Sequence, residues 1–118
     1  GDVTREDSVL MNIVLHNVGR VFKEMGQFET ALQHLRLSQQ TSIKLKDEEG
    51  RPYALDELGD VMIRQGKYDS ALIYLQLALD EINNFIRKDP ETLVKELRTK
   101  TLIKIAKAYM FKKEFDSA

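Results

Sequence analysis

Apolar residues recur at steps of three and four along most of the chain, which is the spacing of amphipathic α-helices. No stretch sustains the two-residue alternation of a half-buried β-strand. The pattern predicts an all-α chain whose helices cover residues 5–25, 28–47, 52–65, 68–87 and 91–112, with a last turn that begins near residue 115. The positions that carry the pattern include Val14, Leu15, Val18, Val21, Phe22, Met25, Leu32, Leu35, Leu55, Leu58, Val61, Met62, Ala71, Leu72, Leu75, Ala78, Leu79 and Ile82.

The predicted helix ends carry suitable capping residues. Thr4 opens a capping-box sequence, since its hydroxyl can accept from the backbone three residues later. Gly26 and Gly66 each follow an apolar run, where a left-handed turn suits a residue without Cβ. Pro52 suits a first helical turn, and Asp89 is a candidate N-cap.

The chain repeats itself. GRVFKEMGQFETAL begins at Gly19 and GDVMIRQGKYDSAL begins at Gly59, so the period is 40 residues. A third, partial copy ends in Phe115–Ala118, which matches Tyr68–Ala71 after a further 47 residues. Such a period indicates stacked supersecondary units, because one helix hairpin cannot bury its own apolar face.

These copies resemble the tetratricopeptide repeat (TPR) family, whose first helix carries large-x-x-Leu-Gly-x-x-Tyr and whose second carries aromatic-x-x-Ala. The usual period is about 34 residues, so 40 and 47 indicate longer helices and links. Copy three has Lys113 where the other copies have Gly26 and Gly66, so we expect a different turn there. The match rests on Leu15, Val18, Gly19, Phe22, Gly26, Phe28, Ala31, Leu35 and Ser38, on Leu55, Leu58, Gly59, Met62, Gly66, Tyr68, Ala71, Leu75 and Ala78, and on Leu102, Ile105, Ala106, Tyr109, Phe115 and Ala118.

The resemblance implies a right-handed α-solenoid of antiparallel helix hairpins in one domain, residues 1–118. Repeat 1 would cover about 5–47, repeat 2 about 52–87 and a truncated repeat 3 about 91–118. The small residues at Gly19 and Gly59 then have a physical role, since two helices would cross there at close range, and a bulky side chain would cost about 1–3 kcal/mol.

Composition narrows the possible partners. Among 118 residues, 18 basic and 19 acidic side chains leave a net charge of −1, whereas nucleic-acid binding usually requires a basic excess. We therefore expect no direct nucleic-acid contact. No apolar run approaches the roughly 20 residues that span a bilayer, so no membrane span is expected. The absence of cysteine says little about compartment, and we favour the cytoplasm only slightly.

Little in the sequence supports catalysis. His16 and His34 are the only imidazoles, and neither has a nucleophile at helical spacing. Asp56, Glu57 and Asp60 gather carboxylates on one helix, which could hold a hard cation, but a solvated or partner-facing acidic patch is the favoured interpretation. No phosphate loop or metalloprotease pattern is present. We expect no enzyme activity and no cofactor.

The TPR resemblance implies that the first helix of each hairpin lines a concave groove. In that register the charge of the groove is mixed, then acidic, then basic. Lys100, Lys104 and Lys107 would pair with acidic side chains or a terminal carboxylate of a peptide, or would simply keep the helix soluble. The candidate groove residues are Ile13, His16, Asn17, Arg20, Lys23, Glu24, Tyr53, Asp56, Glu57, Asp60, Ile63, Arg64, Lys100, Ile103, Lys104, Lys107, Met110 and Phe111.

Two functions follow from this reading. The first is a protein-interaction module that binds a peptide or a partner's helix in the groove. The alternative is a sensory or regulatory input domain of a larger signalling or transcription-regulating protein, motivated by the third copy that stops at Ala118. Leu102, Ile105 and Tyr109 would lack a covering helix, so a homodimer through this helix is expected at high concentration.

Overall fold

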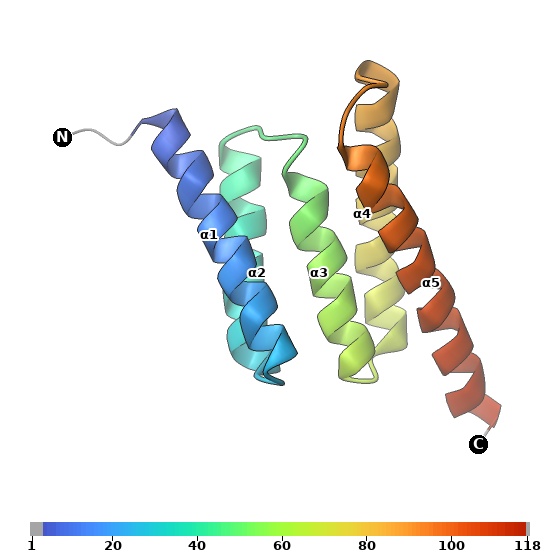
Figure 1. Cartoon of the computed structure of the whole chain (residues 1–118). Helices are drawn as coiled ribbons and strands as arrows, with labels where there is room; N and C mark the ends of the chain where they lie inside the picture. The colour runs from blue at the N-terminus through green and yellow to red at the C-terminus, as the bar shows by residue number, and fades with distance from the viewer. Residues whose placement is uncertain (1–3, 118) are drawn as a thin grey trace.

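Five α-helices make up the computed structural model, which describes residues 4–117. α1, α3 and α5 lie side by side in one layer, and α2 and α4 lie behind them (Figure 1). The Cα atoms extend over 57 × 33 × 18 Å, and the shortest dimension corresponds to two helix layers. The predicted all-α fold is confirmed, while its right-handed sense stays a prediction. The helices are α1 (Arg5–Glu24), α2 (Phe28–Lys44), α3 (Arg51–Arg64), α4 (Tyr68–Lys88) and α5 (Val94–Ser117).

The capping box at the start of α1 is confirmed. The Asp7 backbone N–H donates to Thr4 Oγ1 at 3.0 Å, and the Thr4 N–H donates to Asp7 Oδ2 at 3.4 Å. These bonds satisfy backbone donors that have no partner inside the helix. Pro52 lies in the first turn of α3, as predicted, where its missing N–H costs no helical hydrogen bond.

Three helices end in the same left-handed turn. Gly26 has φ +78° and Gly66 has φ +76°, which confirms the predicted role of both glycines. After α1, the Gly26 N–H donates to the Lys23 carbonyl and the Gln27 N–H to the Phe22 carbonyl, a Schellman closure. Lys46, with φ +54°, closes α2 with the same pair of bonds, so this helix ends at Lys44 rather than at the predicted residue 47.

The bounds of the last helix differ most from the prediction of 91–112. Asp89 does not cap α5; its carboxylate accepts from the Glu91 N–H, and the Thr92 hydroxyl accepts from the Val94 N–H where the helix begins. At the other end α5 continues through Lys113 to Ser117, so the predicted break between a helix that ends at residue 112 and a last turn that begins near 115 is wrong. The physical reason lies at Lys113, since a residue with a Cβ does not favour the left-handed conformation that Gly26 and Gly66 adopt.

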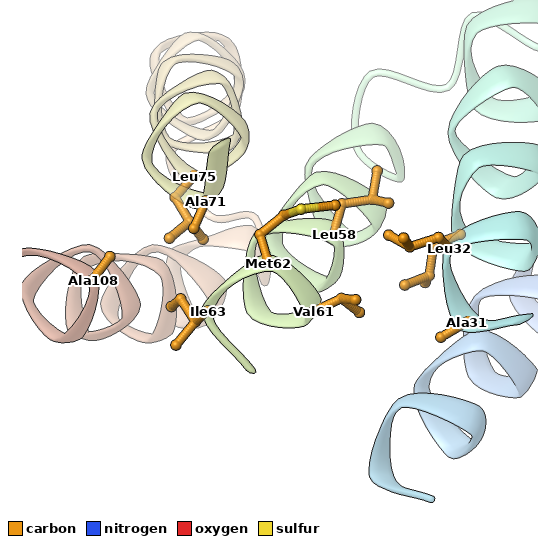
Figure 2. Packing of buried hydrophobic residues seen from close by; sticks show 10 residues of the cluster. Ala31, Leu32, Leu58, Val61, Met62, Ile63, Ala71, Leu75 and Ala108 are labelled. Carbon is orange, nitrogen blue, oxygen red and sulfur yellow. The ribbon is translucent and has the colours of Figure 1, made fainter. Parts of the chain in front are cut away.

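The repeated glycines mark the closest helix crossings. Figure 2 shows the core, in which Leu58, Val61, Met62 and Ile63 of α3 belong to one cluster with side chains of α2, α4 and α5. A Cβ built on Gly59 would lie 2.5 Å from Leu75 Cγ, and one built on Gly19 would lie 2.8 Å from Leu35 Cγ. Both leucines are fully buried. The close crossing predicted from the repeat is confirmed, and a leucine one turn beyond the alanine is the main contact of each glycine.

We expect Gly59→Ala to lower the free energy of unfolding by about 1–2 kcal/mol. Overpacking costs about 1–3 kcal/mol, and the higher helix propensity of Ala offsets up to about 1 kcal/mol. Urea denaturation measures the change. In a Leu75→Ala background the clash disappears, so Gly59→Ala should become neutral or stabilising there. An equal loss in both backgrounds would contradict the crossing.

Apolar side chains are exposed at both ends of the stack. On α1, half of the predicted stripe faces outward, including Val14, Val21 and Met25, because only α2 packs closely on this helix. On α5, Leu102 and Tyr109 are exposed, while Ile105 packs against the core. The homodimer through α5 stays a prediction. Within residues 4–117, no helix has both the length and the apolar character needed to cross a bilayer.

Candidate functional site

The layer formed by α1, α3 and α5, here called the first-helix face, contains the predicted groove residues. Lys23 of α1 is buried beneath it, and its Nζ donates to Glu57 Oε2 and to Asp60 Oδ2 of α3, both at 2.6 Å. Burial by itself would lower the pKa of Lys23, but the hydrogen bonds to Asp60 and Glu57 outweigh it, and the pKa is raised. Burial likewise opposes ionisation of Asp60, yet the bond from Lys23 holds the Asp60 pKa below its ordinary value. This lysine and two carboxylates therefore join α1 to α3 as charged groups.

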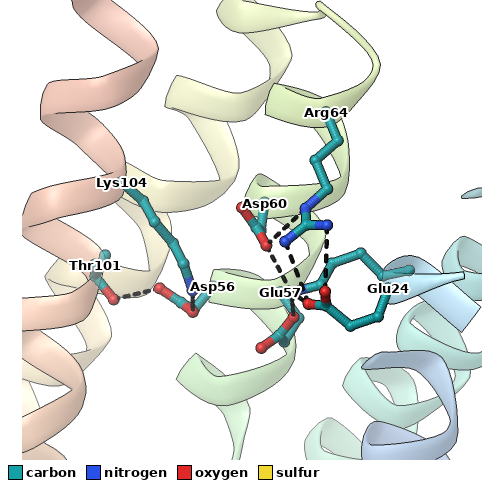
Figure 3. Close-up of polar contacts among 8 residues, drawn as sticks. Glu24, Asp56, Glu57, Asp60, Arg64, Thr101 and Lys104 are labelled. Atoms are coloured by element: carbon teal, nitrogen blue, oxygen red, sulfur yellow. Dashed lines mark hydrogen bonds and ion pairs between the residues drawn. The ribbon is translucent and has the colours of Figure 1, made fainter. Parts of the chain in front are cut away.

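Arg64 adds a second link between the same helices. Its guanidinium reaches both oxygens of Glu24, at 3.2 and 3.4 Å, and its Nε lies 3.3 Å from Asp60 Oδ2 (Figure 3). A second such pair joins the end of α4 to the link between α2 and α3, where Lys88 Nζ donates to Glu48 Oε2 at 2.9 Å. In both pairs the two residues lie 40 positions apart, which is one repeat. Equivalent positions of successive repeats therefore meet with opposite charge.

Asp56 joins α3 to α5. It is 2% exposed, accepts from Thr101 Oγ1 at 2.7 Å, and forms an ion pair with Lys104 (Figure 3). Thr101 is fully buried and Lys104 mostly so. The buried carboxylate thus has both a neutral and a charged donor, the condition under which a buried ion is tolerated.

The acidic cluster predicted on α3 divides between two neighbours. Asp56 faces α5, whereas Glu57 and Asp60 face α1, so the three carboxylates do not converge on one point (Figure 3). Among residues 4–117, no group of three or more His, Asp or Glu side chains is arranged to hold a metal ion. The predicted groove residues that already bind a neighbouring helix are Lys23, Glu24, Asp56, Glu57, Asp60, Arg64 and Lys104.

Other predicted groove residues remain open to solvent. Four of them are exposed, the neutral Asn17 and the cations Arg20, Lys100 and Lys107. Within residues 4–117 none of the three cations forms an ion pair. The apolar side chains exposed with them include Ile13, Ile103 and Met110, while Ile63 is buried in the core. Phe111 lies over the ring of Tyr68, with 6.0 Å between the ring centroids, so it packs beside the α3–α4 turn.

His16 and Tyr53 lie together at a cavity of about 510 Å³ between α1, α2 and α3. Their rings meet edge to face, with centroids 6.3 Å apart. Burial lowers the pKa of His16; Glu57 opposes this shift and Arg20 adds to it, so the imidazole is neutral at pH 7. The other residues that line the cavity are Val9, Asn12 and Ile13 of α1, Ser38 of α2, and Asp47, Glu49 and Gly50 of the link to α3.

Sequence reasoning missed several of these positions. Asn12 is buried and its Nδ2 donates to Ser42 Oγ at 2.7 Å, a contact between residues 30 positions apart that no local pattern indicates. Asp47 and Glu49 line the cavity, although three consecutive acidic residues in the sequence indicate only a solvated link. Ser38 was found only as a small residue in the repeat pattern, since a buried hydroxyl has the same helical spacing as a buried methyl.

Comparison with known proteins gives one family. The family model for the tetratricopeptide repeat matches residues 10–80, which contain α2, α3 and most of α1 and α4. Neither the search of curated proteins nor the search of solved structures gave a significant match.

Proposed function

Because the chain belongs to the tetratricopeptide repeat family, whose members are generally protein-interaction modules, we propose that its first-helix face binds a peptide or a partner's helix. One observation carries the proposal: within residues 4–117, Arg20, Lys100 and Lys107 are exposed and form no ion pair. The carboxylates of α3 between them are already neutralised by Lys23, Arg64 and Lys104. The net effect is a face that carries free positive charge. It suits a partner segment with acidic side chains.

Apolar contacts would supply the remainder of the affinity. Ile13 is half exposed on α1, and Ile103 and Met110 are exposed on α5, beside the free cations. A partner segment that crosses α1, α3 and α5 would bury these side chains while its carboxylates meet Arg20 and Lys107. Apolar burial favours binding without direction, and the charges fix the orientation of the segment.

A peptide display selection tests this proposal. We expect peptides selected on the chain to be acidic, and Arg20→Glu and Lys107→Glu each to weaken them by fivefold or more in fluorescence polarisation. These two residues are chosen because they take no part in holding the helices together. Lys44→Glu is the matched control, since Lys44 is exposed on α2 in the other layer. If the selected peptides bind equally well to Arg20→Glu and Lys107→Glu, or are weakened by Lys44→Glu, they bind a surface other than the first-helix face.

A further inference from the structure

The cavity beside His16 differs in character from the rest of the first-helix face. It has a volume of about 510 Å³, within the range of sites that hold a side chain or small ligand. Val9, Ile13 and the ring of Tyr53 give it apolar and aromatic walls. Its polar lining comes from Asn12 and His16 of α1, from Ser38 of α2 and from the link that precedes α3. A long side chain with an apolar stem and a polar end has the matching shape.

Two buried polar atoms of residues that line this cavity have no hydrogen-bond partner within residues 4–117. Asn12 is 6% exposed, and although its Nδ2 donates to Ser42, its Oδ1 has no hydrogen-bond partner within residues 4–117. His16 Nε2 is also buried and has no partner there. Buried polar atoms are nearly always paired, and leaving one unpaired costs about 1–3 kcal/mol. A donor group that enters the cavity would remove that cost once a side-chain movement uncovers Asn12 Oδ1.

The charged side chains that line the cavity are both acidic. Asp47 and Glu49 line it, and the Asp47 carboxylate also orders the link by accepting from the Gly50 N–H at 3.0 Å. Burial raises the pKa of the Tyr53 hydroxyl, and Glu49 and Glu96 raise it further. Glu48, by contrast, is already paired with Lys88, and Arg51 with Glu81. The cavity therefore combines free acceptors with negative charge.

We propose that this cavity binds an arginine side chain of a partner peptide. The guanidinium offers five donors and no acceptor, so it can serve Asn12 Oδ1 and the Glu49 carboxylate together, and its plane can stack on the Tyr53 ring. The inference rests on the proposed function and adds an orientation to it. The arginine lies between the middle of α1 and the first turn of α3, and acidic residues of the same peptide extend toward Arg20 and Lys107.

The probe for this site is N-acetyl-arginine methylamide, titrated into the 15N-labelled chain to about 10 mM, a range suited to the weak affinity of one side chain. We expect amide shifts at Gly50 and Tyr53 and at the Asn12 side-chain amide. The matched probe is the citrulline analogue, which has nearly the same shape without the charge, and we expect it to bind at least tenfold more weakly. Equal binding of the two probes, or shifts that are spread over the surface, would overturn the assignment.

Two variants locate the charge. Glu49→Gln should weaken the arginine probe threefold or more, whereas Glu48→Gln, one position away but outside the cavity, should not change it. Asn12→Leu should abolish the shifts, and its denaturation midpoint reports whether the chain still folds. If the arginine probe has the same affinity for Glu49→Gln as for the wild type, the cavity is not the arginine site.

The outcome separates this inference from the proposed function. If peptides selected on the chain depend on Arg20 and Lys107 but tolerate the replacement of arginine by citrulline, the first-helix face binds peptides and the arginine site is wrong. If the arginine probe binds the cavity and no selected peptide depends on Arg20 or Lys107, the proposed function is wrong.

Discussion

Replacing Lys23 by Met is expected to lower the free energy of unfolding by about 3–5 kcal/mol at pH 7. The Met side chain fills similar space, so the loss comes from the charges that remain. Glu57 would stay buried and Asp60 partly buried without the ammonium that now lies 2.6 Å from each. Arg64 would still serve Asp60, which leaves Glu57 as the more strongly affected carboxylate.

The pH dependence of this loss follows from the shifted pKa values. Asp60 has a lowered pKa in the fold, so it stabilises the protein above about pH 4, the range of an unfolded carboxyl, and loses this effect as the pH falls through the folded pKa. Lys23 has a raised pKa, so its contribution is present below about pH 10 and is lost as the pH rises through the folded value. The difference between the wild type and Lys23→Met should therefore shrink at both extremes.

Urea denaturation across this pH range provides the measurement. Lys44→Met is the matched control, because Lys44 is exposed, and it should change stability by less than about 0.5 kcal/mol. In the triple variant Lys23→Met, Glu57→Gln, Asp60→Asn the stranded charges are gone, and we expect it to regain at least half of the loss. If the triple variant is no more stable than Lys23→Met, the lost free energy of unfolding comes from packing and not from the unpaired charges.

The second large effect is expected at Asp56. Asp56→Asn keeps the shape of the side chain but removes the negative charge that pairs with Lys104 and accepts the hydrogen bond from Thr101. We expect the free energy of unfolding to fall by about 2–4 kcal/mol. Because repeats contact only their neighbours, the loss should be concentrated in α5. Hydrogen exchange should show faster opening of the α5 amides and little change in α1 and α2.

Asp116→Asn is the control for this variant, since Asp116 is exposed near the end of the same helix and forms no ion pair within residues 4–117. Uniformly faster exchange over all five helices would show that the stack opens as one unit. That result would contradict a local role of Asp56.

The sequence predicted the fold well because two physical constraints leave marks in it. The close crossings need Gly19 and Gly59, and the left-handed turns favour Gly26 and Gly66, so the 40-residue period and the hairpins could be found without a structure. Lys46 takes the same backbone conformation without the glycine that marks it, and the end of α2 was placed three residues late. Around Lys113 the sequence contains no glycine or proline that would end a helix. The prediction placed an end at residue 112 only because the first two copies end at the equivalent position.

The candidate site was predicted only in part. Register placed Lys23, Asp56 and Lys104 on the first-helix face, and they do lie on these helices. Register could not show that they point at a neighbouring helix while Arg20 and Lys107 point at solvent. Arg20 lies three residues from Lys23, and Lys107 lies three residues from Lys104, so each pair occupies neighbouring positions on one helix face. Asn12 escaped detection because its partner, Ser42, lies 30 positions away.

The two ion pairs between residues one repeat apart bear on the order of the hairpins. Glu24 meets Arg64, and Glu48 meets Lys88. Two identical hairpins would bring like charges together at both contacts, carboxylates if the first copy is repeated and cations if the second is. The sequence differences between the copies therefore favour the native order of the hairpins. A chain made by duplicating the first copy would keep every glycine and lose this means of telling its units apart.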